Sequence, residues 1–260
     1  MIARALTIAG SDSGGGAGIQ QDLKTFQAHG VWGMTAITAV TVQNTIGVSG
    51  FVEIPPETVA AQIEAVASDI GVDAAKTGML ASAAIVEAVA KAVRDAEIDK
   101  LVVDPVFISK HGDPLLHADA VDALRREILP LAFVVTPNAH EAGELAGVAV
   151  RTRADQTEAA RAILALGARA VLVKGGHVEG KEAVDVLAVG DRTVEFSAER
   201  LDTPNTHGTG CMLSAAITAG LAKGEDLETA ISAAKRSVTE GIKNSLAIGK
   251  GIGPVNPGRI

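Results

Sequence analysis

The chain of 260 residues is 47% apolar and carries a formal net charge of −8 at pH 7. This length and apolar content predict a single globular domain over residues 1–260. The acidic balance argues against nucleic-acid binding, since no basic patch is evident. No apolar run reaches membrane-spanning length and no signal-peptide pattern is present, so we expect a cytoplasmic protein with no membrane partner. The single cysteine, Cys211, excludes an internal disulfide, and no histidine is spaced for a zinc site.

Short β-branched runs alternate with helical stretches, which is typical of a doubly wound, mostly parallel sheet with helices on both faces. The expected strands are residues 5–8, 36–42, 74–77, 101–103, 133–136 and 170–173, followed by an antiparallel pair at 183–189 and 193–197. The expected helices are residues 17–29, 57–70, 81–95, 118–129, 139–145, 156–166, 211–221 and 227–245. In such sheets, ligands bind at the carboxyl ends of the strands.

A glycine-rich loop follows the first strand at residues 10–18, with the sequence GSDSGGGAG. Its glycines allow a ligand to approach the backbone closely. It lacks the Lys-Ser/Thr pair of a P-loop and the glycine spacing of a dinucleotide site. Within it, Asp12 either accepts hydrogen bonds from a ligand or caps the next helix, and both interpretations stay open.

Other polar residues follow later strands. Gln43 offers paired donor and acceptor groups that suit the edge of a heteroaromatic ring, although an amide at this place could also complete a turn. Further polar groups at expected strand ends are Asp104, Asn138, Glu141 and Lys174. Two acids and an amide beside a phosphate site suit Mg²⁺, which takes a few oxygen ligands and retains several waters.

The most informative segment is residues 205–211, NTHGTGC, which leads directly into an apolar helical stretch. A Gly-Thr-Gly turn that opens a helix directs several backbone N–H groups and the positive end of the helix dipole to one place. This arrangement favours binding of a phosphate. Cys211 would lie in the first helical turn, where the local field favours the thiolate and lowers the thiol pKa.

Together these residues resemble the hydroxymethylpyrimidine kinase / phosphohydroxymethylpyrimidine kinase family of thiamine biosynthesis, within the ribokinase-like superfamily. The resemblance covers nearly the whole chain. It is carried by residues 9–20, 22–26, 43–45, 76–80, 104–106, 112–116, 136–138, 174–177, 205–211 and 249–255. The subfamily is indicated by Gln43-Asn44-Thr45 and by the Cys that ends Gly-Thr-Gly-Cys, where sugar kinases of the superfamily usually have Asp.

The resemblance implies a ribokinase-like three-layer αβα fold and a set of site residues. The residues expected around the pyrimidine ring are Gly10, Asp12, Val42, Gln43, Met79 and Val106. Cys211 would face the substrate hydroxymethyl oxygen, and the amides of Gly208, Thr209 and Gly210 would hold the transferring phosphoryl group. Asp104 and Glu141 would organise Mg²⁺, and the residues expected at the ATP phosphates are Asn138, Lys174 and Thr209. A homodimer is also expected.

The expected reaction is transfer of the γ-phosphoryl group of MgATP to 4-amino-5-hydroxymethyl-2-methylpyrimidine and then to its monophosphate. Two alternatives stay open: a pyridoxal or pyridoxine kinase of the same superfamily, and a non-catalytic pyrimidine-binding sensor. One segment departs from the family pattern. Residues 107–111 read FISKH where Met-Val-Ala-Lys-Ser is more usual, and the bulk of Phe107 bears on the substrate range.

Overall fold

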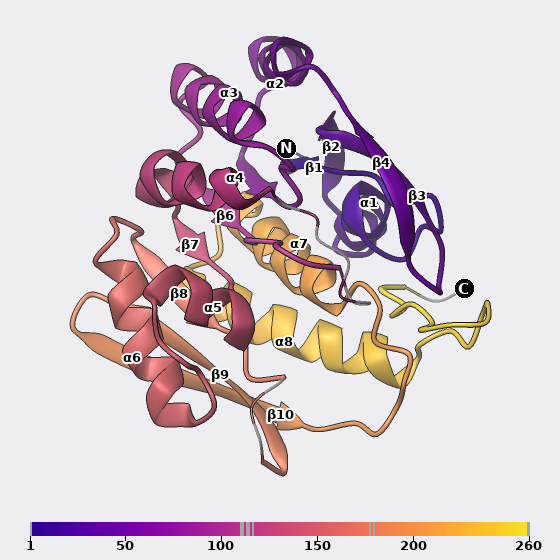
Figure 1. The fold of residues 1–260 in the computed structure, drawn as a ribbon, viewed down its shortest axis with the longest axis vertical. Coiled ribbons are helices and arrows are strands. Elements are labelled where there is room, and N and C mark those ends of the chain that lie inside the picture. Colours follow the sequence, from indigo (N-terminus) through magenta and orange to yellow (C-terminus); the bar gives the residue numbers. More distant parts are fainter. Residues whose placement is uncertain are drawn as a thin grey trace.

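A computed structural model describes residues 2–109, 112, 115, 117–176, 178 and 180–258. An eight-stranded sheet runs through it in the order β10-β9-β8-β7-β6-β5-β1-β2 (Figure 1). The strands are β1 (Arg4–Ala9), β2 (Trp32–Ile37), β5 (Ala74–Thr77), β6 (Leu101–Val103), β7 (Val134–Val135), β8 (Ala170–Val173), β9 (Glu182–Val189) and β10 (Arg192–Glu199). The six strands from β2 to β8 pair in parallel, and β9 and β10 add an antiparallel edge.

The central strands β6, β7 and β8 are apolar on both faces, as is typical of strands that helices cover on both sides. Alternate residues enter different cores. Leu101 and Val103 pack in one hydrophobic cluster, whereas Val102 between them packs in another. Ala170 and Leu172 of β8 likewise lie on the face opposite to Val171 and Val173. The alternation follows from the two-residue repeat of a strand and requires a helical layer on each face.

The helices supply these two layers (Figure 1). The first cluster is covered by α2 (Pro56–Asp69), α3 (Ala83–Asp95), α4 (Ala118–Ala123), α5 (Ala139–Ala146) and α6 (Arg153–Leu164). The opposite face is covered by α1 (Gly18–Ala28), α7 (Thr209–Ala222) and α8 (Leu227–Lys243). The predicted three-layer α/β class is therefore confirmed, whereas the single domain over residues 1–260 stays a prediction.

The expected strand at residues 36–42 is wrong, because the chain divides there. β2 ends at Ile37, and a separate two-stranded sheet begins with β3 (Ala39–Gln43), which pairs with β4 (Val48–Glu53). Thr38 at the break is fully buried, and its hydroxyl donates to the Met79 carbonyl at 2.6 Å. The sequence patterns did not predict β4. This β3–β4 hairpin projects beside α1 (Figure 1).

The expected helix at residues 118–129 also changes form. It begins as α4, continues as a π-helical turn over Leu124–Ile128, and ends in a 3₁₀ turn over Leu129–Leu131. Pro130 lies in that last turn and cannot extend an α-helix. In contrast, α6 begins three residues before its predicted start, because Thr152 and Asp155 form a capping box.

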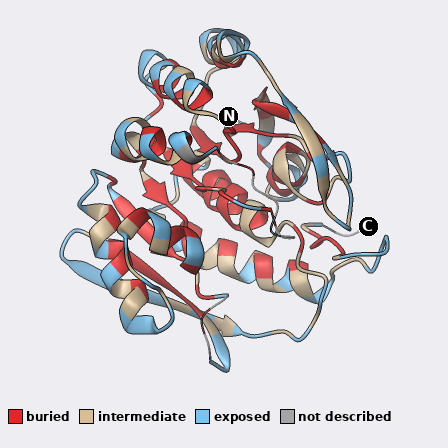
Figure 2. Ribbon diagram, in the orientation of Figure 1, coloured by how far each residue is buried: buried red, intermediate tan, exposed pale blue. Residues whose placement is uncertain are grey.

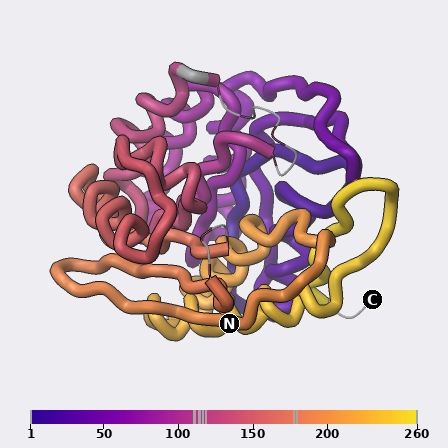
Figure 3. The backbone as a smooth tube through the Cα atoms, turned by 60° about the horizontal axis from the view of Figure 1, so that its bottom comes forward, coloured from indigo at the N-terminus to yellow at the C-terminus, as the bar shows by residue number. Residues whose placement is uncertain are grey.

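Two further features position the site. The ten residues from Met212 to Leu221 of α7 are all buried, and Figure 2 shows this helix as red over most of its length. The segment after α8 returns to the β3–β4 hairpin, where the Ile252 N–H donates to the Thr45 carbonyl at 2.8 Å. Figure 3 shows this yellow segment beside the N-terminal third of the chain.

Within the described part of the chain, no helix combines the length and apolar character needed to span a membrane.

Candidate active site

A cavity of about 840 Å³ opens at the carboxyl ends of the parallel strands. It brings together most of the residues that the sequence singled out. Those that line it are Gly10, Gln43, Met79, Asp104, Val106, Asn138, Glu141, Lys174, Gly208, Thr209, Gly210 and Cys211. Asp12 and Val42 are not among the lining residues.

The turn that precedes α7 forms one end of the cavity. Gly208 has a left-handed backbone with φ of 81°, and a Cβ atom placed on it would lie 1.8 Å from the Gly16 carbonyl oxygen, so only glycine fits. α7 starts at Thr209, and its first intrahelical bond runs from the Met212 N–H to the Gly208 carbonyl. The N–H groups of Gly210 and Cys211 therefore lie in the first turn, where an α-helix offers donors to a bound anion.

The position of this turn is fixed by a buried pair. His207 Nε2 lies 2.8 Å from Asp12 Oδ2. The Asp12 carboxylate also accepts the N–H groups of Gly14, Gly16 and Ala17 at 2.7–3.0 Å. Burial alone would raise the pKa of Asp12, but His207 and the Gly14 and Ala17 N–H groups lower it below its ordinary value. Asp12 thus organises the glycine-rich loop, and its expected contact with the pyrimidine stays a prediction.

This role of His207 was missed from the sequence, because an isolated histidine in a loop is usually exposed. In the structure it is 4% exposed, and its backbone bonds on both sides to the C-terminal segment: its N–H to the Gly253 carbonyl and its carbonyl to the Val255 N–H. The loop after β1, the turn that precedes α7 and the C-terminal segment therefore meet at one residue.

A cluster of charges lies next to the turn. Lys174 Nζ is 2.8 Å from Asp104 Oδ1 and 3.8 Å from Glu141 Oε2. A Cβ atom placed on Gly210 would lie 3.3 Å from the same ammonium, so Lys174 also borders the first turn of α7. Glu141 accepts the Asn138 N–H at 2.7 Å in the capping box of α5.

These neighbours shift the titration of the cluster. Burial raises the pKa of Glu141 to about 7, with Lys174 opposing the rise and Asp104 adding to it. Burial would also raise the pKa of Asp104, but the positive charges of Lys174 and Lys76 outweigh it and lower that pKa. The pKa of Lys174 is raised, because Asp104 and Glu141 outweigh the effect of burial. A buried acid that titrates near neutrality is common at functional sites.

The donor set suits Mg²⁺ held mainly by a nucleotide. The Asp104 and Glu141 carboxylates both lie within 4 Å of the Lys174 ammonium, and the Asn138 amide oxygen beside them accepts the Glu141 N–H. Among the described residues no group of three or more His, Cys, Asp or Glu could hold a metal ion. Mg²⁺ commonly binds through one or two carboxylates, several waters and the phosphates of its substrate.

Cys211 is half-buried at the third position of α7. The expectation that its pKa is lowered is wrong. Burial raises the pKa of the thiol to about 12, and the negative charges of Asp22 and Asp104 add to the rise. Lys76 and the Gly18 N–H oppose the rise without cancelling it. The cost of removing the thiolate from water therefore exceeds the effect of the groups that favour it.

The opposite wall of the cavity suits a small ring. A Cβ atom placed on Gly10 would lie 3.1 Å from Met79 Sδ, so glycine leaves room for the methionine there. Gln43 Oε1 lies 3.2 Å from the Thr41 hydroxyl, and both side chains line the cavity. Val42, between them on the same strand, points to the other face and is 66% exposed. The structure therefore separates Val42 from the rest of the expected ring pocket.

The segment that departs from the family pattern reaches this wall through Ile108 and Ser109, whereas Phe107 is not among the lining residues. Phe107 is buried, and its carbonyl accepts the Leu115 N–H at 2.9 Å. Lys110 and His111, and likewise His177 of the 174–177 motif, lie outside the described residues.

Comparison with known proteins assigns the family. The family model described as phosphomethylpyrimidine kinase matches residues 12–256. The chain belongs to this family. It is 51% identical over 253 residues to a hydroxymethylpyrimidine/phosphomethylpyrimidine kinase of Streptomyces coelicolor, covering 97% of this chain and 93% of that one. The resemblance inferred from the sequence is confirmed, and the chain is a phosphotransferase.

Two solved structures confirm the ribokinase-like fold. An ADP complex of Bacillus subtilis pyridoxal kinase has a TM-score of 0.91 and 43% identity, covering 98% of this kinase and 97% of that chain. A phosphomethylpyrimidine kinase of Clostridium difficile has a TM-score of 0.82 and 42% identity, covering 92% and 99% respectively.

One part of the cavity is lined by apolar side chains that the sequence analysis did not single out. Apolar side chains from β10, the following loop, α7 and α8 line it: Ala198, Leu201, Leu213, Val238 and Ile242. Arg200 borders it and donates to the carbonyls of Gly176 and Val178, both at 2.6 Å, which holds the loop after β8. The four-residue spacing of Val238 and Ile242 is a signal of a buried helix face but not of a ligand.

Proposed function

We propose that this chain transfers the γ-phosphoryl group of ATP to the hydroxymethyl oxygen of 4-amino-5-hydroxymethyl-2-methylpyrimidine, and then a second group to the monophosphate. One observation carries the proposal: the phosphate-binding turn lies in a single cavity between a ring-sized wall at Gln43 and Met79 and the charges of Lys174, Asp104 and Glu141. The names of the relatives, hydroxymethylpyrimidine/phosphomethylpyrimidine kinase and phosphomethylpyrimidine kinase, agree with this substrate.

The ring side provides recognition. The Gln43 amide presents one donor and one acceptor to the polar edge of an aminopyrimidine, and Met79 and Val106 border the ring. Gly10 leaves room beside them. The Thr41 hydroxyl next to the amide holds it against the wall. Because Asp12 stabilises the loop that carries Gly10, we propose that it contributes to this pocket indirectly.

The turn and the charged cluster carry the transfer. The first-turn N–H groups of α7 and the Lys174 ammonium surround the place where negative charge develops on the phosphoryl group. The substrate oxygen forms the new O–P bond while the bond from the γ-phosphorus to the bridging oxygen breaks and ADP leaves. Cys211 can accept the hydroxyl proton only in its thiolate form. Because the raised thiol pKa makes the thiolate a minor form near pH 7, we expect positioning to dominate and the proton to leave late.

Mg²⁺ is proposed as the metal, held by Asp104 and Glu141 directly or through water, with Asn138 beside them. When bound, it neutralises phosphate charge. ATP is proposed to place its base in the apolar half of the cavity, next to Val238 and Ile242. Dependence on ATP fits the cytoplasmic location expected from the sequence.

A pyridoxal kinase activity is the second candidate. The observation that favours it is the TM-score of 0.91 and 43% identity to the solved Bacillus subtilis pyridoxal kinase. A non-catalytic sensor is less well supported, since Lys174, Asp104, Glu141 and Cys211 all meet in one cavity.

A homodimer is proposed on the outer face of the β3–β4 hairpin. Val40, Val42 and Val52 are 49–70% exposed there, which is unusual for three valines on one small sheet. Val40 and Val52 are directly paired across the two strands. Val40→Lys combined with Val52→Lys should convert a dimer to a monomer in sedimentation velocity, whereas an unchanged sedimentation coefficient would remove this surface from the interface.

One experiment tests the function. Formation of ADP is measured with the hydroxymethylpyrimidine, its monophosphate and pyridoxal as acceptors at equal concentrations. We expect the highest kcat/KM for the pyrimidine and measurable turnover of its monophosphate. Preference for pyridoxal would establish the second candidate, and tight pyrimidine binding without ADP formation would establish the sensor.

A further inference from the structure

A buried ion pair lies behind the first turn of α7. Lys76, on β5, places Nζ 3.0 and 2.9 Å from the two carboxylate oxygens of Asp22 on α1. The Thr7 hydroxyl donates to Asp22 Oδ2 at 2.7 Å. Both charged side chains are 0% exposed. The ring, nucleotide and metal roles described above use neither of them.

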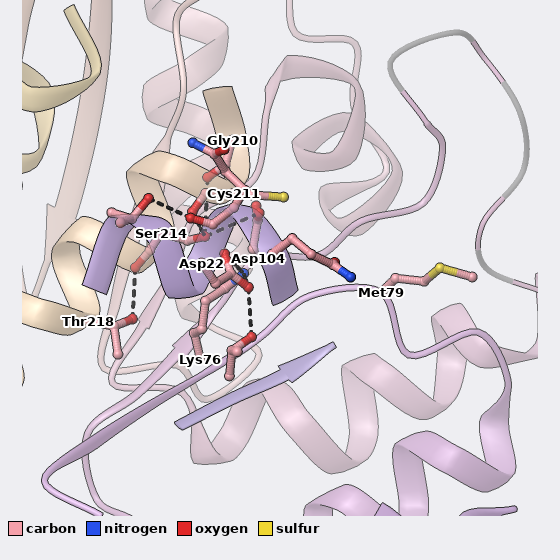
Figure 4. A network of polar contacts seen from close by, with 12 residues as sticks. Asp22, Lys76, Met79, Asp104, Gly210, Cys211, Ser214 and Thr218 are labelled. Atoms are coloured by element: carbon pink, nitrogen blue, oxygen red, sulfur yellow. Dashed lines mark hydrogen bonds and ion pairs between the residues drawn. The ribbon is translucent and has the colours of Figure 1, made fainter. Parts of the chain in front are cut away.

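Stability alone does not explain this pair. Removing two charges from water is costly, and apolar replacements of buried ion pairs are often neutral or stabilising. Its orientation is informative. Lys76 and Gly78 are among the residues that line the cavity and Asp22 is not, and a Cβ atom placed on Gly78 would lie 3.5 Å from Lys76 Nζ, so the ammonium lies directly behind the cavity wall. Figure 4 shows Lys76, Asp22 and Asp104 gathered beside the turn that carries Gly210 and Cys211.

The charges around Cys211 come from four elements or their loops. Lys76 on β5 is the charge that acts most strongly on the thiol, and it favours the thiolate. Asp22 on α1 and Asp104 after β6 act in the opposite direction. Lys174 after β8 also interacts with Cys211. The effect is reciprocal, since a charge on Cys211 raises the pKa of Lys76.

We propose that Lys76 and Asp22 form a positioning pair for phosphoryl transfer, in which Asp22 holds the Lys76 ammonium at the cavity wall and this ammonium stabilises the negative charge that develops at Cys211 and at the reacting oxygen. The inference rests on the proposed function, because it assigns the reaction to this end of the cavity. A fixed charge in a site shielded from water acts more strongly than the same charge in solvent.

The test compares two double variants. Asp22→Asn with Lys76→Met removes the pair, and Asp73→Asn with Arg4→Met removes a partly exposed pair, 2.7 Å apart, whose residues do not line the cavity. Cys211 is the only thiol, so the rate of alkylation by iodoacetamide reports on it alone. Alkylation is measured without nucleotide from pH 7 to 10.5. The alkylation rate of the Asp22/Lys76 double variant should be about threefold or more lower than that of the wild type, and its plot of rate against pH should move to higher pH.

The control variant should keep the wild-type profile. If both double variants alkylate as the wild type does, the pair is only structural and the inference is overturned. Circular dichroism checks that each variant folds. If the Asp22/Lys76 double variant does not fold, Lys76→Met alone carries the test, because a buried and unpaired Asp22 takes up a proton.

Kinetics separate this inference from the proposed function. In the Asp22/Lys76 double variant, kcat should fall about tenfold or more with little change in KM for ATP, as expected when charge stabilisation is lost in the transition state. A shifted alkylation profile together with full activity of Cys211→Ala would support the electrostatic effect on the thiol and refute the proposed base. An unshifted profile together with an inactive Cys211→Ala would refute only the pair.

Discussion

Glu141 should make the free energy of unfolding depend on pH in a direction opposite to that of most acids. Its pKa is raised from 4.5 to about 7 by burial, with Asp104 adding to the rise. Between these two values the folded chain holds a proton that the unfolded chain has released, so stability falls as pH rises. At about 1.4 kcal/mol per pKa unit, the difference amounts to about 3 kcal/mol.

The perturbation is Glu141→Gln, which keeps an oxygen for the Asn138 N–H but cannot titrate. Urea unfolding without Mg²⁺ or nucleotide, repeated from pH 4.5 to 7.5, should show the wild type losing up to about 3 kcal/mol relative to Glu141→Gln. The control is Asp155→Asn in the capping box of α6. Asp155 is exposed and its pKa is lowered by the Arg151 and Thr152 N–H groups, so it should matter only as pH falls below about 4. Parallel pH curves for wild type and Glu141→Gln would refute the reasoning.

The remaining predictions concern the rest of the site. Gln43→Leu should leave the polar edge of the pyrimidine without hydrogen-bond partners, at a cost of about 1–3 kcal/mol per unpaired group, and so lower kcat/KM more than tenfold. An unchanged kcat/KM would make Gln43 a structural amide. Because the raised pKa of Cys211 leaves little thiolate near pH 7, Cys211→Ala should lower kcat only by about 10²-fold, the low end for a general base, with ATP affinity retained. Cys211→Asp should restore part of the lost rate, and a near wild-type rate for Cys211→Ala would leave the transfer to positioning alone. Alkylation of wild-type Cys211 should keep rising with pH beyond 10 and be slowed by the substrate alcohol, and a plateau near pH 8 would contradict the raised pKa. Asp12→Asn should destabilise the chain at pH 7, and the deficit should vanish as pH falls below about 4, because the Asp12 pKa is lowered; a pH-independent deficit would exclude its ionisation as the cause.

Much of the fold follows from the sequence because its central strands are apolar and short. The segments 74–77, 101–103 and 170–173 were predicted with the bounds that the structure has, since each is a short run of mostly β-branched or small residues that follows a helix. The break at Thr38 could not be predicted in the same way. Its neighbours form one continuous apolar run, and the turn depends on a hydrogen bond from its hydroxyl to Met79, 41 residues away.

The site was predictable where function depends on backbone geometry. Gly208 is a glycine because the Gly16 carbonyl leaves no room for a side chain, and the turn it forms is evident from the local sequence. The pKa of Cys211 was not predictable, because it depends on the burial of the thiol and on charges from three other parts of the chain. His207 and Asp12 are 195 residues apart, so no local pattern indicates that they pair.

The complete burial of α7 between Met212 and Leu221 has a consequence for how the protein moves. Amide hydrogens of a helix enclosed on all sides exchange with solvent only when large parts of the molecule unfold. The turn proposed to bind phosphate is attached to this buried segment, while the β3–β4 hairpin that carries Gln43 lies outside the eight-stranded sheet. Adaptation to a new alcohol would therefore begin in the hairpin and leave the proposed phosphate-binding end unchanged.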